Sequence, residues 1–237
     1  MACGYDGRVS SPSDIPMAQR KRQLVANELT EAALQLLAQR GFDAVTVDEI
    51  AAVAGVSKRT FFRYFASKED VVVRFLADMG NGMRAELAAR PAAEPPSVAL
   101  RHTVAVPLAA CGDHAERALP VVRLIMRTPA LRARFLERQA QWRDDLSVEL
   151  AARLGLEARD GAEAAAPAGL YPGLAAGMAL VAFDAVLQQW SDGDGTADPA
   201  GLTDSAFAVL AASLDAVPER VVVPGAADQG RAANRTA

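Results

Sequence analysis

Cysteine and aromatic residues are scarce in this chain of 237 residues. Its two cysteines, Cys3 and Cys111, are too few for a disulfide framework and suit a reducing compartment. Aromatic residues make up 5% of the sequence, while alanine, leucine and arginine dominate it, and this composition favours helix over strand. We therefore expect an all-α protein of the cytoplasm.

Membrane and catalytic signals are also missing. We find no uninterrupted run of about 18 apolar residues and no apolar N-terminal stretch, so we expect neither a membrane span nor a signal peptide. The motifs of serine hydrolases, phosphate-binding loops and zinc proteases are absent as well. His102, Cys111 and His114 are too few for a metal site. We expect no catalytic residue, cofactor or metal, and a helical enzyme or metalloprotein is a remote alternative.

The net charge of −4 does not point to a nucleic-acid partner, but the positive charge is unevenly placed. Between Ser57 and Lys68 there are four basic residues and no acidic one. A second basic cluster, Arg20 to Arg22, would belong either to a flexible arm that reaches DNA or to a solvated helix start. Local basic patches, more than net charge, determine contact with phosphates.

The stretch from Thr46 to Lys68 has the pattern of two short helices and the start of a third. Thr46 and Glu49 form a capping box, and Ser57 can cap the second helix. Gly55 occupies the sharp turn between them. Phe61 and Phe65 would point into the core, which leaves the basic side of the second helix outside. A helix pair with one apolar and one basic face is typical of proteins that read the DNA major groove.

Arg59 and Arg63 lie four residues apart, so both face one direction and either could reach a guanine edge. Lys58 could read a base or contact phosphate. The alternative interpretation of this surface is a solvated basic face without a ligand.

Residues 20–68 resemble the DNA-binding domain of the TetR (tetracycline-repressor) family, above all in the run G-V-S-x-x-T-F-F-R-Y-F-x-S-K-E. The resemblance implies a homodimeric, all-helical transcription factor with a helix-turn-helix domain and a C-terminal domain that often binds a small molecule. It also implies DNA contacts by Thr46, Thr60, Phe62, Tyr64 and Lys68. Phe62 stands where tyrosine is common in the family, so it lacks the hydroxyl that would bind phosphate. The N-terminal sequence resembles a branch found beside mycofactocin gene clusters, which makes fatty acyl thioesters candidate effectors.

We divide the chain into four parts. Residues 1–17 are a disordered arm, 18–66 the three-helix DNA-binding domain, 67–217 a helical effector-binding and dimerisation domain, and 218–237 a disordered tail. In the family the last two long helices pair with their symmetry mates. The apolar helix Leu170 to Trp190 and the helix Leu202 to Val217 resemble that ending.

The second domain offers two candidate ligand features. Apolar residues that could line a pocket, although core is the default for each, are Met126, Phe135, Trp142, Met178 and Phe183. A cluster of arginines could form the mouth of an anion-binding pocket, or it could simply be exposed helix surface. Its members are Arg123, Arg127, Arg132, Arg134 and Arg138. We predict a ligand-responsive repressor that binds a palindromic operator as a dimer. The alternative is a regulator without an effector, switched by a protein partner.

Overall fold

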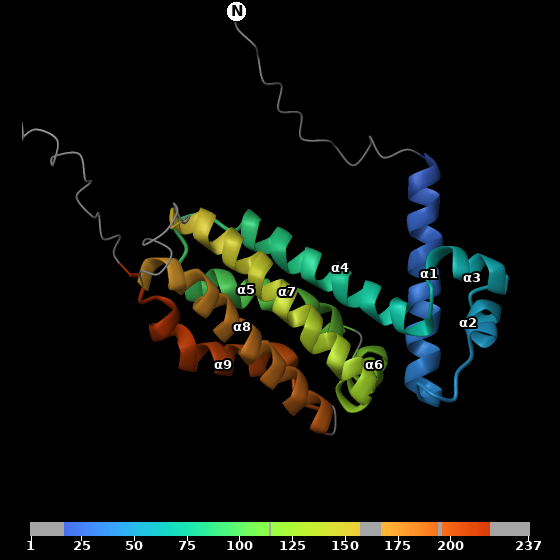
Figure 1. Ribbon diagram of the computed structural model, residues 1–237. Helices are drawn as coiled ribbons and strands as arrows, with labels where there is room; N and C mark the ends of the chain where they lie inside the picture. The colour runs from blue at the N-terminus through green and yellow to red at the C-terminus, as the bar shows by residue number, and fades with distance from the viewer. Residues whose placement is uncertain (1–16, 114, 157–166, 194–195, 219–237) are drawn as a thin grey trace, which may run out of the picture. The chain divides into compact units, whose positions relative to one another are not determined.

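The computed structural model describes residues 17–113, 115–156, 167–193 and 196–218 (Figure 1). The described residues form α1 (Met17–Arg40), α2 (Val47–Val53), α3 (Lys58–Tyr64), α4 (Lys68–Ala89), α5 (Pro96–Asp113), α6 (Ala115–Arg127), α7 (Pro129–Leu154), α8 (Pro167–Asp192) and α9 (Pro199–Leu214). Within these ranges there is no strand, and the predicted all-α class is confirmed. Almost all of the predicted arm and tail, together with Cys3 and His114, lies outside the described residues.

The apolar pattern of the sequence predicts an amphipathic helix from Gln23 to Arg40, but helix α1 begins six residues earlier, at Met17. Arg20 to Arg22 therefore lie on its exposed first turns, so this cluster is a solvated helix start and not the end of an arm. Gly41 follows the last residue of the helix, the place where the sequence pattern also predicts its end. Its backbone N–H donates to the carbonyl of Leu37 at 2.9 Å with φ of 89°, a conformation that glycine adopts without steric cost.

The chain divides into two compact units, each built from segments that are distant in sequence. The first comprises Met1–Gly80, Ala110–Arg138 and Leu187–Ala197, and the second comprises Asn81–Ala109, Gln139–Val186 and Asp198–Ala237. Helices α1–α3 thus share the first unit with α6 and the end of α8. The predicted functional boundary between residues 66 and 67 stays a prediction.

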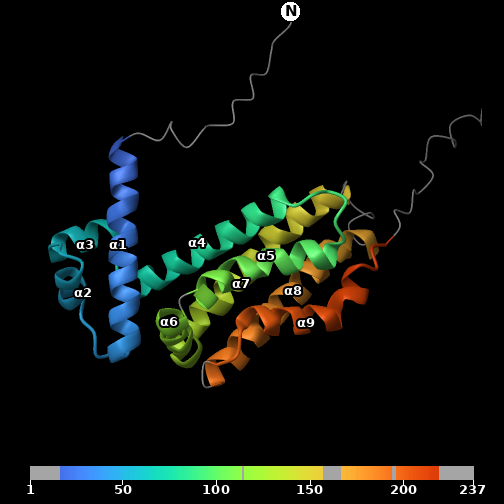
Figure 2. The ribbon, with the colours of Figure 1, turned by 180° about the vertical axis from the view of Figure 1, so that it is seen from behind.

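The first unit holds α3 with its apolar side inward. Helix α1 packs against α2 and α6, and α2 packs against α3; Figure 2 shows α2 and α3 beside α1. Fully buried side chains from these helices form the core, among them Leu29, Leu37, Ile50 and Phe61. Because this side of the helix pair is filled, the polar residues of α3 remain on the surface.

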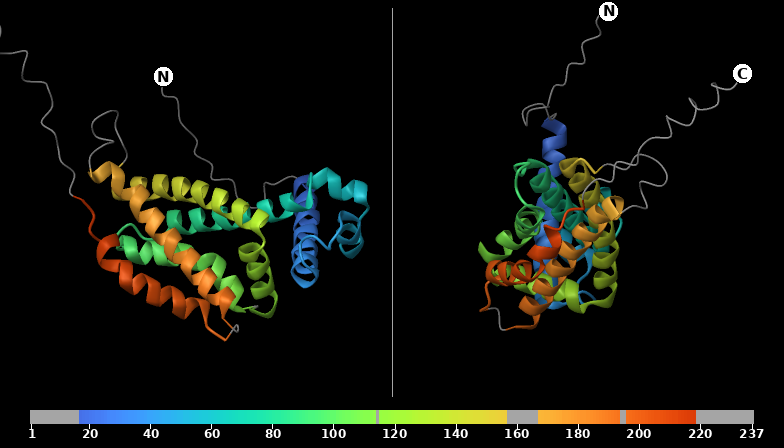
Figure 3. Two further views of the ribbon diagram at one scale, coloured as in Figure 1. Left: turned by 60° about the horizontal axis from the view of Figure 1, so that its bottom comes forward. Right: turned by 90° about the vertical axis from the view of Figure 1, so that its left-hand side faces the viewer.

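Hydrogen bonds connect the helix ends within the second unit. Asp215, which caps α9, accepts hydrogen bonds from the backbone N–H and the hydroxyl of Ser97 at the start of α5, both at 2.8 Å. Tyr171 of α8 donates to the carbonyl of Leu214. Helices α8 and α9 lie side by side in all the views (Figures 1 to 3). These bonds satisfy backbone groups that helix ends leave unpaired.

One part of α8, Gly169–Asp192, is long and apolar enough, by length and composition alone, to cross a membrane, and it was not singled out as such from the sequence. Just over half of its apolar window is buried inside the protein. Apolar residues around most of a helix are also what a buried core helix requires.

Candidate nucleic-acid interface

The predicted capping box at the start of α2 is present. The hydroxyl of Thr46 accepts from the backbone N–H of Glu49 at 3.3 Å, and the Glu49 carboxylate accepts from the backbone N–H of Thr46 at 2.9 Å. The same carboxylate accepts from the Thr46 hydroxyl and from Arg40. The backbone and hydroxyl bonds of Thr46, and then the charge of Arg40, lower the pKa of Glu49 below its usual value of 4.5. The box fixes the first helix of the pair.

The turn and cap that precede α3 also follow the prediction. Gly55 has φ of 66° in the turn, and the Ser57 hydroxyl accepts from the backbone N–H of Thr60 at 3.1 Å. On the inner side of α3, Phe61 and the extended C-cap residue Phe65 are buried, and their ring centroids lie 5.6 Å apart. The cap and these two rings fix both the position and the rotation of α3.

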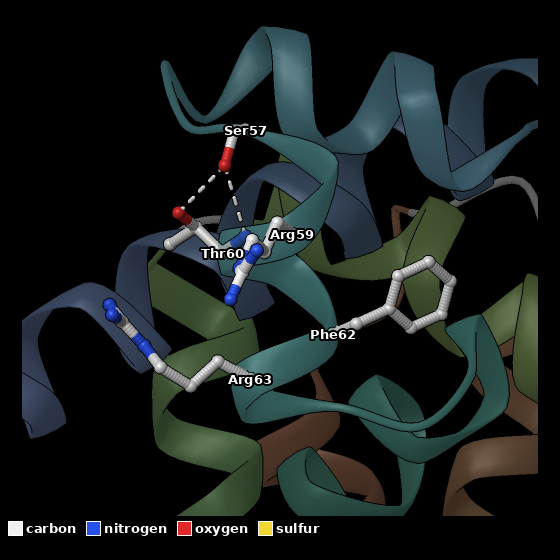
Figure 4. Close-up of a pocket in the computed structure, with 5 residues that line it drawn as sticks. All are labelled: Ser57, Arg59, Thr60, Phe62 and Arg63. Atoms are coloured by element: carbon white, nitrogen blue, oxygen red, sulfur yellow. Dashed lines mark hydrogen bonds between the residues drawn. The ribbon is translucent and has the colours of Figure 1, made fainter.

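The outward side of α3 forms an open hollow of about 550 Å³. It is lined by Ser57, Arg59, Thr60, Phe62 and Arg63. Figure 4 shows Phe62 and Arg63 leaving the helix toward opposite sides, with Arg59 between them. The structure therefore brings four of the eight predicted contact residues (Arg59, Thr60, Phe62 and Arg63) onto one surface.

Some predicted contact residues on or beside α3 already have partners inside the protein. The Lys58 ammonium pairs with Asp48 of α2 at 2.9 Å. Arg63 lies 5.2 Å from the ring centre of Tyr64 and donates to its hydroxyl at 3.4 Å. Arg59, in contrast, has no ion pair or hydrogen bond within the described part of the chain. Its guanidinium is the cation on this helix that is most available to a ligand.

Lys68, at the start of α4, occupies a different environment. Its ammonium donates to the backbone carbonyls of Phe42 at 2.6 Å and Val45 at 3.1 Å. It also lies 4.4 Å from the centre of the Phe42 ring. Two of its three N–H donors are therefore engaged, and one remains for a phosphate.

Sequence reasoning missed two features of this surface. It did not find Asp48 as the partner of Lys58, because the two residues are ten positions apart and meet only through the geometry of the turn. It also named Ser57 only as a cap, although Ser57 lines the hollow and its hydroxyl lies 2.9 Å from that of Thr60.

The predicted effector residues fall into both units. Met126 and Phe135 belong to the first unit. Arg132 contacts the sulfur of Met126 and the ring of Phe135. Trp142, Met178 and Phe183 belong to the second. The Trp142 and Phe183 rings meet edge to face, with their centroids 6.3 Å apart.

The arginines of α6 cap another helix. Arg123 donates to the carbonyls of Ser191 and Gly193, and Arg127 donates to that of Ser191 and pairs with Asp192. These bonds satisfy carbonyl groups at the end of α8. Two of the five arginines considered for an anion site thus have a structural role within the first unit.

Comparison with known proteins agrees with this helix-turn-helix architecture. Residues 29–75 match the model of bacterial regulatory proteins of the tetR family, and residues 90–215 match the MftR C-terminal domain. The fold and the cationic outer face of α3 define a transcriptional regulator of the helix-turn-helix class. The chain belongs to the TetR family, and its second domain is of the type found in the mycofactocin-associated branch.

Individual relatives support this assignment. The chain is 32% identical to the HTH-type transcriptional regulator TcmR of Streptomyces glaucescens, over 64% of this chain and 70% of the relative. It is 31% identical to the protein named as the mycofactocin biosynthesis transcriptional regulator MftR of Mycobacterium tuberculosis. That match covers 60% of this chain and 71% of the relative. The crystal structure of the regulator FadR of Bacillus subtilis with stearoyl-CoA shares the fold. Its TM-score is 0.57 at 20% identity, covering 78% of this chain and 97% of FadR.

Proposed function

We propose that this regulator is a cytoplasmic repressor that binds a near-palindromic DNA operator as a homodimer and releases it when a small hydrophobic effector binds. The observation that carries the DNA-binding part is the outward face of α3. There Arg59 has no partner in the described part of the chain, and Phe62 and Arg63 stand beside it over an open surface. A guanidinium without an internal partner can form two hydrogen bonds with a guanine edge in the major groove.

Around this face we propose contacts of two kinds. Arg59, Phe62 and Arg63 face the bases. Phosphate contacts come from the residues that surround them, namely Thr46, Lys58, Thr60, Tyr64 and Lys68. Several of these groups are held by internal bonds, which orients them before DNA arrives. Phosphate contacts of this kind fix position, while base contacts select sequence.

For the dimer we propose the exposed apolar side of α8 and α9 as the contact surface. Leu170, Leu174 and Val181 of α8 are exposed at intervals of four and seven residues, and Val209 of α9 is 80% exposed. That spacing places the three α8 residues along one side of the helix. A second copy that covered this side would remove exposed apolar surface from water and give the two-fold symmetry that a palindromic operator matches.

For the effector we propose a binding site in the second unit around Trp142, Met178 and Phe183. FadR of Bacillus subtilis has been crystallised with stearoyl-CoA, and this chain shares its fold. Long-chain acyl-CoA thioesters are therefore the effectors to test first. Binding would weaken operator affinity only by the difference in effector affinity between the DNA-bound and released states.

Selection of duplexes from a random DNA pool by the purified full-length protein tests the DNA-binding function. We expect enrichment of one near-palindrome with half-sites separated by about one helical turn, ~10 base pairs, or a multiple of it. A pool without an enriched sequence would contradict the proposed function.

Titration of the protein–DNA complex with palmitoyl-CoA tests the effector class, with free CoA as the control. Loss of the complex with palmitoyl-CoA alone supports a hydrophobic effector. If no acyl-CoA of any chain length releases the DNA, the acyl-CoA proposal is wrong, and the alternative of a protein partner without an effector gains support.

A further inference from the structure

The outward face of α3 contains an apolar ring in a cationic setting. Phe62 is 49% exposed and is the only exposed phenylalanine in the described part of the chain. Arg59 and Arg63 line the same open surface, with Arg59 between Phe62 and Arg63 (Figure 4). A single exposed apolar side chain is common on protein surfaces, but this one lies on the proposed DNA contact surface, where charged and polar groups would be expected.

The orientation of this ring is fixed by its neighbour. The Phe61 ring lies beneath it, with the centroids 5.5 Å apart and the ring planes at 89°, and Phe61 is fully buried. The space on the inner side of the helix is therefore filled, so Phe62 cannot turn into the core without displacing Phe61. The ring remains directed toward whatever approaches α3.

The chemistry of the ring limits what it can recognise. A phenyl group neither donates nor accepts a conventional hydrogen bond, so it gains nothing from a phosphate oxygen or a polar base edge. In the major groove, the C5-methyl of thymine is the one apolar group on the base edges. Thymine is therefore the base whose edge matches Phe62.

The neighbouring arginine sets where that thymine lies. Arg59 and Phe62 are three residues apart on the helix, a rise of about 4.5 Å. Stacked base pairs are ~3.4 Å apart. Side chains from these two positions therefore reach bases within about two steps of each other. Lys58 and Thr60 are held by Asp48 and Ser57, which leaves the readout to the outward residues.

We propose that Phe62 is a specificity-determining residue that reads a thymine methyl within about two base pairs of a guanine bound by Arg59, once in each operator half-site. This assignment rests on the proposed function and adds the base chemistry of the same surface. The contact is an apolar one, so it selects thymine over cytosine and over any base without a methyl group.

Replacement of thymine by deoxyuridine tests the proposal, because it removes only the C5-methyl. The probe is the fluorescein-labelled consensus duplex from the random-pool selection, with each thymine of both half-sites exchanged in turn and binding followed by fluorescence anisotropy. Burial of one methyl group corresponds to about a four-fold change in affinity, and to about fifteen-fold when both half-sites lose it. We expect one symmetric pair of positions to show this loss with the unmodified protein.

Variants at position 62 assign the effect to the ring. Phe62→Ala should bind the thymine and deoxyuridine duplexes equally, whereas Phe62→Tyr, which keeps the ring, should retain the preference for thymine. Val148→Ala, which shortens an exposed apolar residue on α7, is the control and should leave the preference unchanged. The proposal is overturned if no thymine position responds, or if Phe62→Ala retains the preference. An enriched palindrome that is insensitive to deoxyuridine overturns this assignment alone, while a pool without enrichment overturns the proposed function as well.

Discussion

Replacement of Lys68 by methionine should destabilise the DNA-binding unit, although the sequence pointed only to a DNA contact for this residue. The substitution removes the ammonium and keeps most of the aliphatic stem. It breaks hydrogen bonds to the carbonyls of Phe42 and Val45 and the cation–π contact with the Phe42 ring. A hydrogen bond to a charged group contributes roughly 1.5–3 kcal/mol, and an exposed cation–π contact about 0.5–1 kcal/mol. Because Lys68 is only half-buried and such terms are not additive, we expect a loss of about 2 kcal/mol.

Thermal unfolding followed by circular dichroism measures this effect. A loss of about 2 kcal/mol lowers the Tm of a protein of this size by roughly 4–8 °C. Lys58→Met is the matched control, since it also removes one lysine of the same helical region. Its ion pair with Asp48 is solvent-exposed on both sides and should contribute at most about 1 kcal/mol. Equal Tm values for the two variants would refute the claim that the Lys68 hydrogen bonds between α4 and the loop after α1 stabilise the fold.

Three further substitutions test other parts of the account. Arg63→Ala should weaken operator binding by ~1–3 kcal/mol if the guanidinium reads a base, and an unchanged gel-shift titration would remove Arg63 from the contact set. Glu49→Ala should lower the Tm at neutral pH, because the lowered pKa of Glu49 means that its carboxylate stabilises the fold above the ordinary value of 4.5. That difference in Tm should shrink as the pH falls below this value, and a difference independent of pH would contradict the capping role. Val181→Glu should convert the dimer into a monomer of 24.9 kDa in sedimentation velocity, whereas an intact dimer would exclude this side of α8 from the interface.

Local sequence signals predicted the helix pair well. The capping box of Thr46 and Glu49, the Ser57 cap and the turn at Gly55 depend on residues at most three or four positions apart, so their chemistry is visible in the sequence. The burial of Phe61 and Phe65 was predicted from helical spacing, and both are buried, although Phe65 follows the helix as its extended C-cap residue. These features fix α3, and for that reason the outward position of Arg59 could be predicted too.

Contacts between distant residues could not be predicted in this way. Lys68 meets carbonyls 23 and 26 positions earlier, and Arg123 of α6 bonds to carbonyls 68 and 70 positions later. The sequence shows that a residue is charged, but the group that this residue contacts depends on how the helices pack. The start of α1 was placed six residues late for a related reason, because its first turns are polar and exposed and carry no apolar periodicity.

The operator affinity of the Arg59→Ala/Arg63→Ala double variant tests the central claim most directly. It should be measured by fluorescence anisotropy on the selected duplex against the Arg84→Ala/Arg117→Ala variant, which removes two exposed arginines elsewhere and changes the net charge equally. We predict that loss of the α3 pair weakens binding by at least ~30-fold, from about 1–3 kcal/mol for each side chain, while the control pair changes it little. Equal affinities of the two variants would contradict the claim that the outward face of α3 reads DNA.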